Sequence, residues 1–310
     1  MIHYKYAGKI MDNISAFLVG KNDVVELSII TLLAGGHLLI EDVPGVGKTT
    51  LANLLAASVD CDFARIQFTP DTLPGDVIGA SVFNMKEGEF LYVPGAIMHN
   101  IVLVDEINRA SPKTQSALLE SMQEQQVTVD KVTYLLPDPF MIIATQNPIE
   151  FVGTHNLPEA QLDRFLMKLS IGYPDIHAER LMSNNYVEGY TALQAKPVLK
   201  RNELICMRQE VQNVFVCEEI IQYIVKLITA TRESKWLTLG GSPRATLGFI
   251  SAARACAYVN GRDFVTPDDV QKVIVHVLSH RLVLTVEARM NKKTPQSIIA
   301  DIVRRVKVPI

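Results

Sequence analysis

Two glycines, a lysine and a threonine stand close together between an apolar run and a second run suited to a helix. Gly45 and Gly47 allow a sharp backbone turn, and Lys48 and Thr49 open a predicted helix over 48–58. Backbone N–H groups at such a turn, and the positive end of a helix dipole, favour a bound anion. In this pattern the lysine reaches the β- and γ-phosphates of a nucleotide, and the threonine ligates Mg²⁺. The sequence therefore predicts a phosphate-binding turn, with Lys48 as a catalytic residue and Thr49 as a metal ligand.

The segment departs from the strict motif at one position. In G-x-x-x-x-G-K-[ST] the first glycine would fall where this chain has Asp42. The core P-G-x-G-K-T remains, with a strand predicted before it and a helix after it, which is the context that separates phosphate-binding turns from chance matches. The alternative is an ordinary strand-to-helix turn that contains a lysine. We favour nucleotide binding.

Two adjacent carboxylates follow the apolar run 101–104. Consecutive apolar residues that are mostly β-branched indicate a buried parallel strand, and ligands of open α/β sheets bind outside the carboxyl ends of such strands. Asp105 would then hold Mg²⁺, directly or through water, and Glu106 would polarise the attacking water. The alternative is a helix N-cap, since acidic residues are common there. The nearby phosphate-binding turn makes the nucleotide interpretation the preferred one.

A third apolar run, 140–145, ends at an amide-rich turn. Asn147 stands just after it and precedes Pro148. An amide at a strand end can hydrogen-bond a water molecule and orient it toward a γ-phosphate. Asn-Pro can also simply form a turn. We assign Asn147 to the catalytic group and keep the turn as the alternative.

These pieces, in this order, resemble those of the AAA+ ATPases, and the sequence between them resembles the MoxR family over nearly the whole chain. The stretches that carry the resemblance are VGK at 19–21, EDVPGVGKTT at 41–50, RIQFTPDTLPGDVIG at 65–79, FLYVPGAI at 90–97, VDEINRASPKTQSALLESMQEQQVTV at 104–129, ATQNPIE at 144–150, LPEAQLDRF at 157–165 and GSPRA at 241–245. The resemblance implies an α/β fold, in which an AAA+ αβα core with a five-stranded parallel sheet (P-loop NTPase) spans 1–174. A C-terminal all-α lid domain would span 175–310. ATP and Mg²⁺ would bind between core and lid, and hydrolysis would move the lid.

The resemblance also implies roles for single positions. Val19 and Gly20 match the segment that lines the adenine pocket. The segment 42–50 matches the phosphate loop, and this adds to the implied nucleotide-binding residues Val43, Pro44, Val46 and Thr50. Asp105 and Glu106 match the Walker B pair. Asn147 matches the first sensor, which reports on the γ-phosphate.

Two arginines complete the implied catalytic set. Arg164 matches the arginine finger and would serve a neighbouring subunit, with Arg109 as the alternative finger. Arg244 matches the second sensor and would contact ATP. It follows Ser242 and Pro243, an N-cap and a first helical residue, so it is predicted in the first turn of a helix. The family also implies a homo-oligomer in the form of a hexameric ring.

Two further segments are predicted hairpins, as in the helix-2-insert branch of AAA+ proteins. One spans 79–93, and the other has alternating apolar residues on both sides of Asp130 and Lys131. In the family such hairpins face the ring pore or a partner. The alternative is a pair of ordinary surface hairpins.

The family implies a chaperone-like remodelling or assembly factor for protein complexes or for metal-cofactor maturation. Its partners would be a protein client and a protein with a von Willebrand factor A domain. Two alternatives stay open, a DNA-stimulated AAA+ motor and a metal-insertion subunit like that of magnesium chelatase. The predicted tip of the first hairpin carries Lys86 beside Glu87 and Glu89, which argues against DNA.

The composition is that of an ordinary globular protein. The chain has 310 residues, of which 48% are hydrophobic and 20% charged, and a formal net charge of −3. It offers no overall positive field to attract nucleic acid or an anionic membrane. The uncharged run 27–40 is shorter than the roughly 20 residues of a membrane-spanning helix, and the first residues lack the apolar core of a signal peptide. We therefore predict a cytoplasmic protein without membrane insertion.

The remaining reactive side chains have structural interpretations. The cysteines show no C-x-x-C pair and no metal-ligand spacing, so reduced thiols are expected. They are Cys61, Cys206, Cys217 and Cys256. His276 and His280 stand one helical turn apart without a carboxylate between them, so structural roles are favoured over metal binding. Trp236, the only tryptophan, is expected to be buried in the lid.

Overall fold

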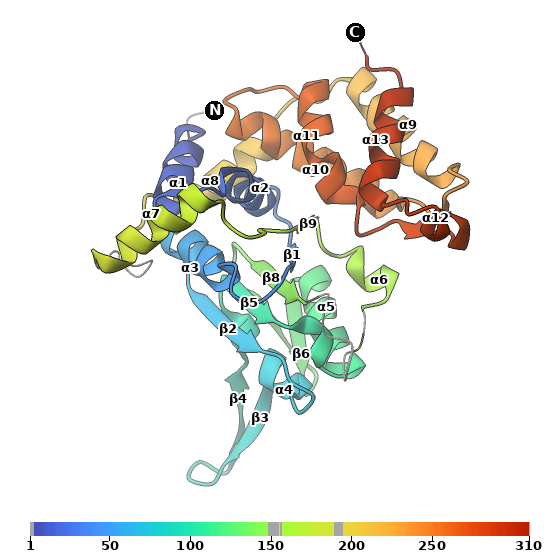
Figure 1. Ribbon diagram of the computed structural model, residues 1–310. Coiled ribbons are helices and arrows are strands. Elements are labelled where there is room, and N and C mark those ends of the chain that lie inside the picture. The colour runs from blue at the N-terminus through green and yellow to red at the C-terminus, as the bar shows by residue number, and fades with distance from the viewer. Residues whose placement is uncertain (1–2, 148–154, 156, 189–194, 310) are drawn as a thin grey trace.

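A five-stranded parallel sheet lies at the centre of the N-terminal half, as predicted. In the computed structural model, which describes residues 3–147, 155, 157–188 and 195–309, the strands follow the order β2, β5, β8, β1, β9 (Figure 1). Their bounds are β1 Leu38–Glu41, β2 Phe63–Gln67, β5 Ile101–Asp105, β8 Met141–Gln146 and β9 Met167–Leu169. All paired strands are parallel, so their carboxyl ends lie at the same edge. That edge carries Asp105 as the last residue of β5.

Helices cover both faces of this sheet. Because successive strand residues point to opposite faces, the buried residues of β1 divide between two apolar clusters. Leu38 and Ile40 pack in the cluster that contains α3 (Lys48–Ser58), and Leu39 packs in the one that contains α5 (Pro112–Glu124). This double burial is the reason that the strands β1, β5 and β8 are apolar at nearly every position, and it confirms the αβα arrangement.

The other helices of this half are placed around the sheet. They are α1 Lys5–Ser15, α2 Asn22–Leu33, α4 Pro74–Ile78 and α6 Glu159–Leu162, with 3₁₀ turns at Ala96–Met98 and Ile107–Arg109. The uncharged run 27–40 forms the end of α2, a turn and most of β1. In the part of the chain that the structure describes, no helix combines the length and the apolar character needed to span a bilayer.

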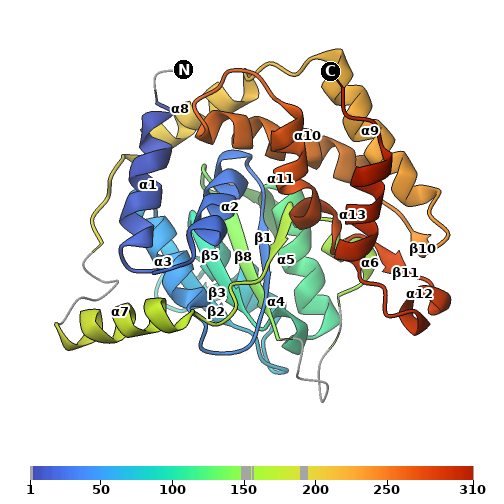
Figure 2. The ribbon, with the colours of Figure 1, turned by 45° about the horizontal axis from the view of Figure 1, so that its top comes forward.

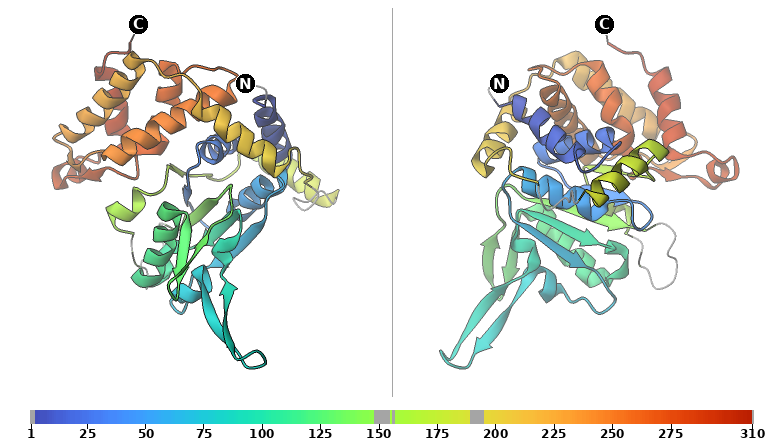
Figure 3. Two further views of the ribbon diagram at one scale, coloured as in Figure 1. Left: turned by 180° about the vertical axis from the view of Figure 1, so that it is seen from behind. Right: turned by 60° about the vertical axis from the view of Figure 1, so that its left-hand side comes forward.

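Both predicted hairpins are present. The first consists of β3 (Gly79–Asn84) and β4 (Glu89–Pro94), and the second of β6 (Gln126–Val129) and β7 (Val132–Leu135). Tyr92 of the first stacks on Tyr134 of the second, with 4.0 Å between the ring centroids. Figure 3 shows the β3–β4 hairpin, in cyan, extending well away from the sheet. Its outer part exposes apolar side chains, among them Met85 and Phe90.

The second half is helical, with one addition to the prediction. Its helices are α7 Ile176–Val187, α8 Arg201–Gln212, α9 Glu218–Arg232, α10 Pro243–Val259, α11 Pro267–Leu278, α12 Val286–Met290 and α13 Pro295–Arg305. A short antiparallel pair, β10 (Leu237–Leu239) and β11 (Val283–Leu284), lies among them. Trp236 precedes β10, is half-buried and packs against the apolar cluster.

One apolar cluster joins the two halves. It contains Leu51 and Leu54 of α3 together with Phe249 of α10 and Ile274 of α11. Figure 2 shows α2 lying among α8, α10 and α11, and α2 packs on both α8 and α10. The helical half is therefore seated on the sheet half by continuous apolar contact.

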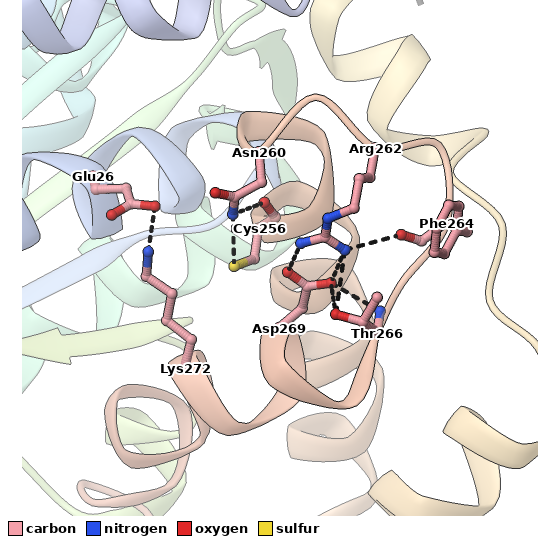
Figure 4. A network of polar contacts seen from close by, with 8 residues as sticks. All are labelled: Glu26, Cys256, Asn260, Arg262, Phe264, Thr266, Asp269 and Lys272. Carbon is pink, nitrogen blue, oxygen red and sulfur yellow. Dashed lines mark hydrogen bonds and ion pairs between the residues drawn. The ribbon is translucent and has the colours of Figure 1, made fainter. Parts of the chain in front are cut away.

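Polar contacts fasten α11 in place (Figure 4). Lys272 of α11 forms an ion pair with Glu26 of α2. At the start of α11, Arg262 donates to both carboxylate oxygens of Asp269, and Asp269 also accepts from the Thr266 backbone at 2.8 Å. Burial opposes the charge of Asp269, but these donors lower its pKa overall. The capping box at Thr266 is thus closed by an arginine.

Candidate functional site

The phosphate-binding turn begins directly after β1. Gly45 and Gly47 have φ angles of 85° and 95°, in the left-handed region that glycine adopts without strain. The 11-residue helix α3 starts at Lys48, so its N-terminus faces the turn. A Cβ built on Gly45 meets no atom within 4 Å, whereas one on Gly47 would lie 3.2 Å from the Leu18 side chain. The turn is therefore open beside Gly45 and lies against the segment that leads to Val19.

Asp42, which replaces the first glycine of the strict motif, anchors this turn. Asp42 is 8% exposed, and its side-chain carboxylate accepts four hydrogen bonds. The donors are Val43 N at 2.8 Å, Ser170 Oγ at 3.0 Å, Ile171 N at 2.7 Å and Gly172 N at 2.6 Å. Burial opposes the charged carboxylate, but the donors outweigh it and lower the pKa of Asp42. The carboxylate thereby ties the start of the turn to the segment after β9.

A cavity of about 340 Å³ lies between the turn and the carboxyl ends of β5 and β8. We call it the nucleotide cavity. The predicted site residues that line it are Pro44, Gly45, Gly47, Lys48, Thr49, Thr50, Asp105, Glu106 and Asn147. Three more residues line it that the sequence analysis did not identify, Arg65, Gln67 and Thr145. Most of the predicted residues are thus brought together by the fold.

Four residues of the two predicted nucleotide-binding segments do not line the nucleotide cavity, and neither do the predicted Arg164 and Arg244. Val46 is buried in the apolar cluster and Val43 packs against it, so their side chains serve the fold. Val19 is half-buried and Gly20 is exposed, and a Cβ on Gly20 would lie 3.0 Å from Ala178 of α7. The segment predicted to line an adenine pocket therefore lies between the turn and α7.

The side chain of Asp105 is engaged on both oxygens. Arg65 Nε donates to Oδ2 at 2.7 Å, and Thr145 Oγ1 donates to Oδ1 at 3.2 Å. The arginine comes from β2 and the threonine from β8, which flank β5 on its two sides. Arg65 is thus paired with Asp105, the carboxylate that the sequence analysis predicts as a Mg²⁺ ligand.

Glu106 follows in an unusual backbone conformation. Its φ of 58° and ψ of 52° are left-handed, which costs a non-glycine residue on the order of 1–3 kcal/mol and is typical of functional sites. Its N–H donates to Thr145 Oγ1 at 3.0 Å, which holds this conformation. The carboxylate accepts from Gln67 Nε2 at 2.8 Å and from Arg109 Nη1 at 3.0 Å. Arg109 is thereby paired with a carboxylate of its own chain.

Only strand pairing could have revealed Arg65 and Gln67. Period-two alternation places both on one face of β2, which the sequence shows. The register pairs Gln67 with Asp105, and that neighbour relation joins segments about forty residues apart. A hydrophobic pattern does not specify which strands are neighbours.

The two predicted arginines lie in a different cavity, of about 280 Å³, which we call the arginine cavity. It shares no lining residue with the nucleotide cavity. Arg244 lies in the first turn of α10, where Ser242 Oγ accepts from Ala245 N at 3.0 Å, so the predicted capping is confirmed. Arg244 Nη2 donates to Gln123 of α5 at 3.1 Å. Within the described residues, the buried Nε of Arg164 has no hydrogen-bond partner.

Asp163 holds the elements that carry these two arginines. It precedes Arg164, and its Oδ2 accepts from Ser242 Oγ, the N-cap of α10, at 2.8 Å. Its Oδ1 accepts from Arg281 Nε at 2.7 Å. Arg281 is 5% exposed, and its Nη2 also donates to the carbonyl oxygen of Phe165 at 2.7 Å. One buried ion pair therefore fixes the arginine-bearing turn, the start of α10 and the end of α11 relative to one another.

The two histidines of α11 and its end have structural roles, as predicted. His280 Nε2 lies 3.0 Å from the Phe165 carbonyl oxygen, and His276 Nδ1 lies 3.4 Å from that of Lys168. Burial lowers the pKa of both imidazoles. Over the described residues, no group of three or more His, Cys, Asp or Glu side chains is arranged to hold a metal by protein ligands alone.

Comparison with known proteins decides the family. Residues 37–167 match the ATPase family associated with various cellular activities (AAA), and residues 229–302 match the AAA lid domain. The chain is 43% identical to Chaperone MoxR1 of Mycobacterium tuberculosis, over 96% of this chain and 80% of that one. This chain belongs to the MoxR family of AAA+ proteins.

Two further relatives agree with membership in the MoxR family. Uncharacterized protein YeaC of Bacillus subtilis is 48% identical over 98% of this chain and 95% of its own length. A solved structure from Cytophaga hutchinsonii, described as that of an ATPase candidate, superposes with a TM-score of 0.92 and 37% identity. It covers 99% of this chain and 96% of the other. The AAA+ core and helical lid described above are thus shared over the full length.

The residues of the nucleotide cavity fit ATP and Mg²⁺. The open glycine turn and the N-terminus of α3 offer backbone donors for phosphate oxygens, and Lys48 adds a cation at the same wall. Thr49 and Asp105 present hard oxygen atoms to this cavity, of the kind that Mg²⁺ prefers together with phosphate oxygens. Lys48 Nζ meanwhile donates to the Asp42 carbonyl at 2.8 Å, beside the turn where phosphates would bind. This donor set is the one that MoxR family membership leads us to expect.

Proposed function

We propose that this protein is an ATPase that binds ATP with Mg²⁺ and uses hydrolysis to remodel other proteins. The observation that carries the proposal is the composition of the nucleotide cavity. There the phosphate-binding turn, Lys48, Asp105, Glu106 and Asn147 face one space of about 340 Å³. Membership in the AAA family supports nucleotide binding.

We propose a role for each of these residues. Lys48 would contact the β- and γ-phosphates, and Thr49 with Asp105 would hold Mg²⁺. When bound, Mg²⁺ supplies charge that neutralises the phosphate oxygens. Glu106, aimed by its left-handed backbone, would accept a proton from the attacking water, and Asn147 would orient that water.

The completed site is proposed to be shared between subunits. Arg164 and Arg244 line a cavity that has no residue in common with the nucleotide cavity of the same chain. In a ring, each could reach the phosphates held by a neighbour, and such an arginine contributes about 10³–10⁵ in rate. Arg109 is paired with Glu106 of its own chain, which favours Arg164 as the residue acting on the neighbour. We therefore propose a homo-oligomer in the form of a hexameric ring.

The remodelling role is supported by a relative and by one surface. The 43% identical relative is named Chaperone MoxR1. In this chain the projecting β3–β4 hairpin exposes Phe83, Met85 and Phe90, side chains suited to a protein client. We propose a protein client and a partner with a von Willebrand factor A domain.

Steady-state ATP hydrolysis against protein concentration tests the proposal. We expect a rate per subunit that rises with concentration, because the site is completed by a neighbour. Lys48→Ala should abolish nucleotide binding, whereas Glu106→Gln should bind ATP and lose roughly 10²–10⁴ in kcat. A wild-type rate no higher than that of Lys48→Ala would contradict ATPase activity. A parallel series with DNA tests the motor alternative, which requires strong stimulation.

Mixed rings test the shared site. Arg164→Ala should bind ATP but lose turnover, and adding Glu106→Gln subunits should restore part of it. In such a mixture some sites combine an intact Glu106 from one variant with an intact Arg164 from the other. The matched control is the double variant Arg164→Ala/Glu106→Gln, which should restore nothing. Absence of rescue at every mixing ratio would count against Arg164 as the residue acting in the neighbour's site.

A further inference from the structure

A third cavity, of about 340 Å³, lies beside the turn between α2 and β1, where its lining includes Leu33, Ala34 and Gly35. Side chains of α8 and α10 form most of its wall, and the turn before β8 contributes Asp138. The polar and charged lining residues are Asp138, Arg208, Gln209, Gln212, Ser251 and Arg254. The cavity shares no residue with the nucleotide cavity, and it adjoins the arginine cavity at Ala34, Gly35 and Ser251.

Arg208 lines this cavity, and one of its three guanidinium nitrogens is buried without a hydrogen-bond acceptor among the described residues. Its Nε donates to the Leu32 carbonyl at the end of α2 at 3.0 Å, which fixes the plane of the guanidinium. Its Nη1 lies 3.6 Å from Asp138 Oδ1, longer than a hydrogen bond. Its Nη2 is buried and has no acceptor among the residues that the structure describes. A buried donor without a partner destabilises a protein, and more so when the group is charged.

Arg254 presents a second unused donor at the same cavity. Its Nε is buried, and neither this atom nor the rest of its guanidinium has a hydrogen-bond or ion-pair partner in the described part of the chain. Arg254 lies one helical turn after Ser251 on α10, so both face the cavity. Two guanidinium groups from different helices thus line one cavity, and each has a buried donor without an acceptor among the described residues.

The charges around the cavity are predominantly positive. Asp138 is the only acidic residue in its lining, and that side chain is 72% exposed to solvent. A further cation, Arg201, donates through Nε to the Asp138 carbonyl at 2.7 Å. Burial lowers the pKa of Arg208 and outweighs the opposing effect of Asp138, as expected for a cation short of counter-charge.

We propose that this cavity is a binding site for a small phosphate-type oxyanion, held by the guanidinium groups of Arg208 and Arg254. The amide groups of Gln209 and Gln212 and the hydroxyl of Ser251 supply further donors. Guanidinium groups bind phosphate oxygens with strong, charge-assisted hydrogen bonds. A volume of about 340 Å³ suits an inorganic phosphate or a small phosphorylated molecule rather than a polymer. Water could satisfy the donors, but only an anion also balances the charge.

Phosphate binding to the wild type and three variants tests this site. Inorganic phosphate is titrated by calorimetry, at constant ionic strength, into wild type, Lys48→Ala, Arg254→Gln and the double variant. Lys48→Ala weakens the contribution of the phosphate-binding turn, so the remaining isotherm reports the new site. We expect one saturable event in Lys48→Ala that Arg254→Gln weakens roughly tenfold or more. Arg304→Gln, which removes a 77% exposed arginine elsewhere, is the matched control and should leave the isotherm unchanged.

A second readout guards against a misfolded variant. Phosphate should raise the melting temperature of Lys48→Ala and leave that of the double variant unchanged. Without phosphate, Arg254→Gln should melt no lower than wild type, because its guanidinium has no described partner to lose. Arg254 is the residue to change, since replacing Arg208 would also remove a bond to α2. An isotherm that is the same with and without Arg254 would overturn the proposal, and saturation by acetate but not by phosphate would overturn its choice of anion.

Discussion

At the scale of single residues, Asp42 explains how this chain tolerates a departure from the strict phosphate-binding motif. A glycine there has no side chain to accept the backbone N–H groups of Ile171 and Gly172. The carboxylate accepts both, and it also accepts from Ser170. Aspartate at the first position of the motif therefore has less backbone freedom than glycine, but its side chain binds the segment after β9.

We expect Asp42→Asn to destabilise the fold by about 2 kcal/mol, because the amide NH₂ would face donors that need an acceptor. Denaturant unfolding measures the difference, with the exposed Asp71→Asn as control. A loss equal to that of the control would contradict this role.

The same carboxylate predicts an acid dependence. Its folded pKa lies below the unfolded value near 3.8, so the carboxylate stabilises the fold fully above about pH 5. That contribution is lost as the pH falls through 3.8 to the lower folded pKa. The difference in unfolding free energy between wild type and Asp42→Asn should therefore be constant above about pH 5 and shrink in acid. A difference that grows in acid would have the wrong sign.

Arg65 predicts how the cavity responds to Mg²⁺. Its Nε pairs with Asp105 at 2.7 Å, and its side chain is half-exposed, so the pair is worth about 0.2–1 kcal/mol. Under the role proposed for Asp105, Mg²⁺ displaces this arginine from the carboxylate, so Arg65→Gln should lower the Mg²⁺ concentration for half-maximal MgATP binding about two- to fivefold. Titration of Mg²⁺ at fixed ATP measures it, and Arg304→Gln is the control. An unchanged or higher Mg²⁺ requirement would argue against competition.

At the scale of elements, Asp163 connects the sheet half to the start of α10, which carries Arg244, and to Arg281 after α11. Asp163→Asn should cost about 3 kcal/mol, because it leaves the guanidinium of Arg281 buried and unpaired. Turnover should fall as well, while ATP binding persists, since the nucleotide cavity does not contain this pair. Denaturant unfolding and ATPase assays measure the two effects. Asp301→Asn, which breaks a partly exposed pair, is the matched control and should cost less than 1 kcal/mol. Equal costs would show that the buried pair has no special role.

The elements themselves were largely predictable, because their signals are local. Helix α3, both hairpins, the buried strands and the N-cap of α10 follow from periodicity, turn residues and capping, and the structure confirms them. What periodicity could not supply is which elements become neighbours. The pairing of Arg65 with Asp105 depends on strand order, and that of Asp163 with Arg281 joins residues 118 apart. The placement of Arg244 away from its own nucleotide cavity also depends on how the lid sits. The boundary at residue 174 and the individual roles of the site residues stay predictions.

At the scale of the whole molecule, the apolar cluster that spans both halves predicts a single unfolding transition. Trp236, the only tryptophan, reports on the helical half by fluorescence, whereas far-UV circular dichroism reports on all helices and strands. Because residues of α3, α10 and α11 share one cluster, the two signals should change at the same denaturant concentration. Two separate midpoints would show that the helical half unfolds on its own.

The two cavities of one chain also have a genetic consequence. The nucleotide cavity and the arginine cavity share no lining residue, so under the proposed mechanism each chain supplies half of two different reaction centres. An allele encoding Arg164→Ala would then yield subunits that still assemble and still hold ATP, yet disable a neighbour. Expressed beside the wild-type gene, such an allele is expected to be dominant, with an effect that grows faster than its share of the total protein. An allele that prevents folding would be recessive by comparison.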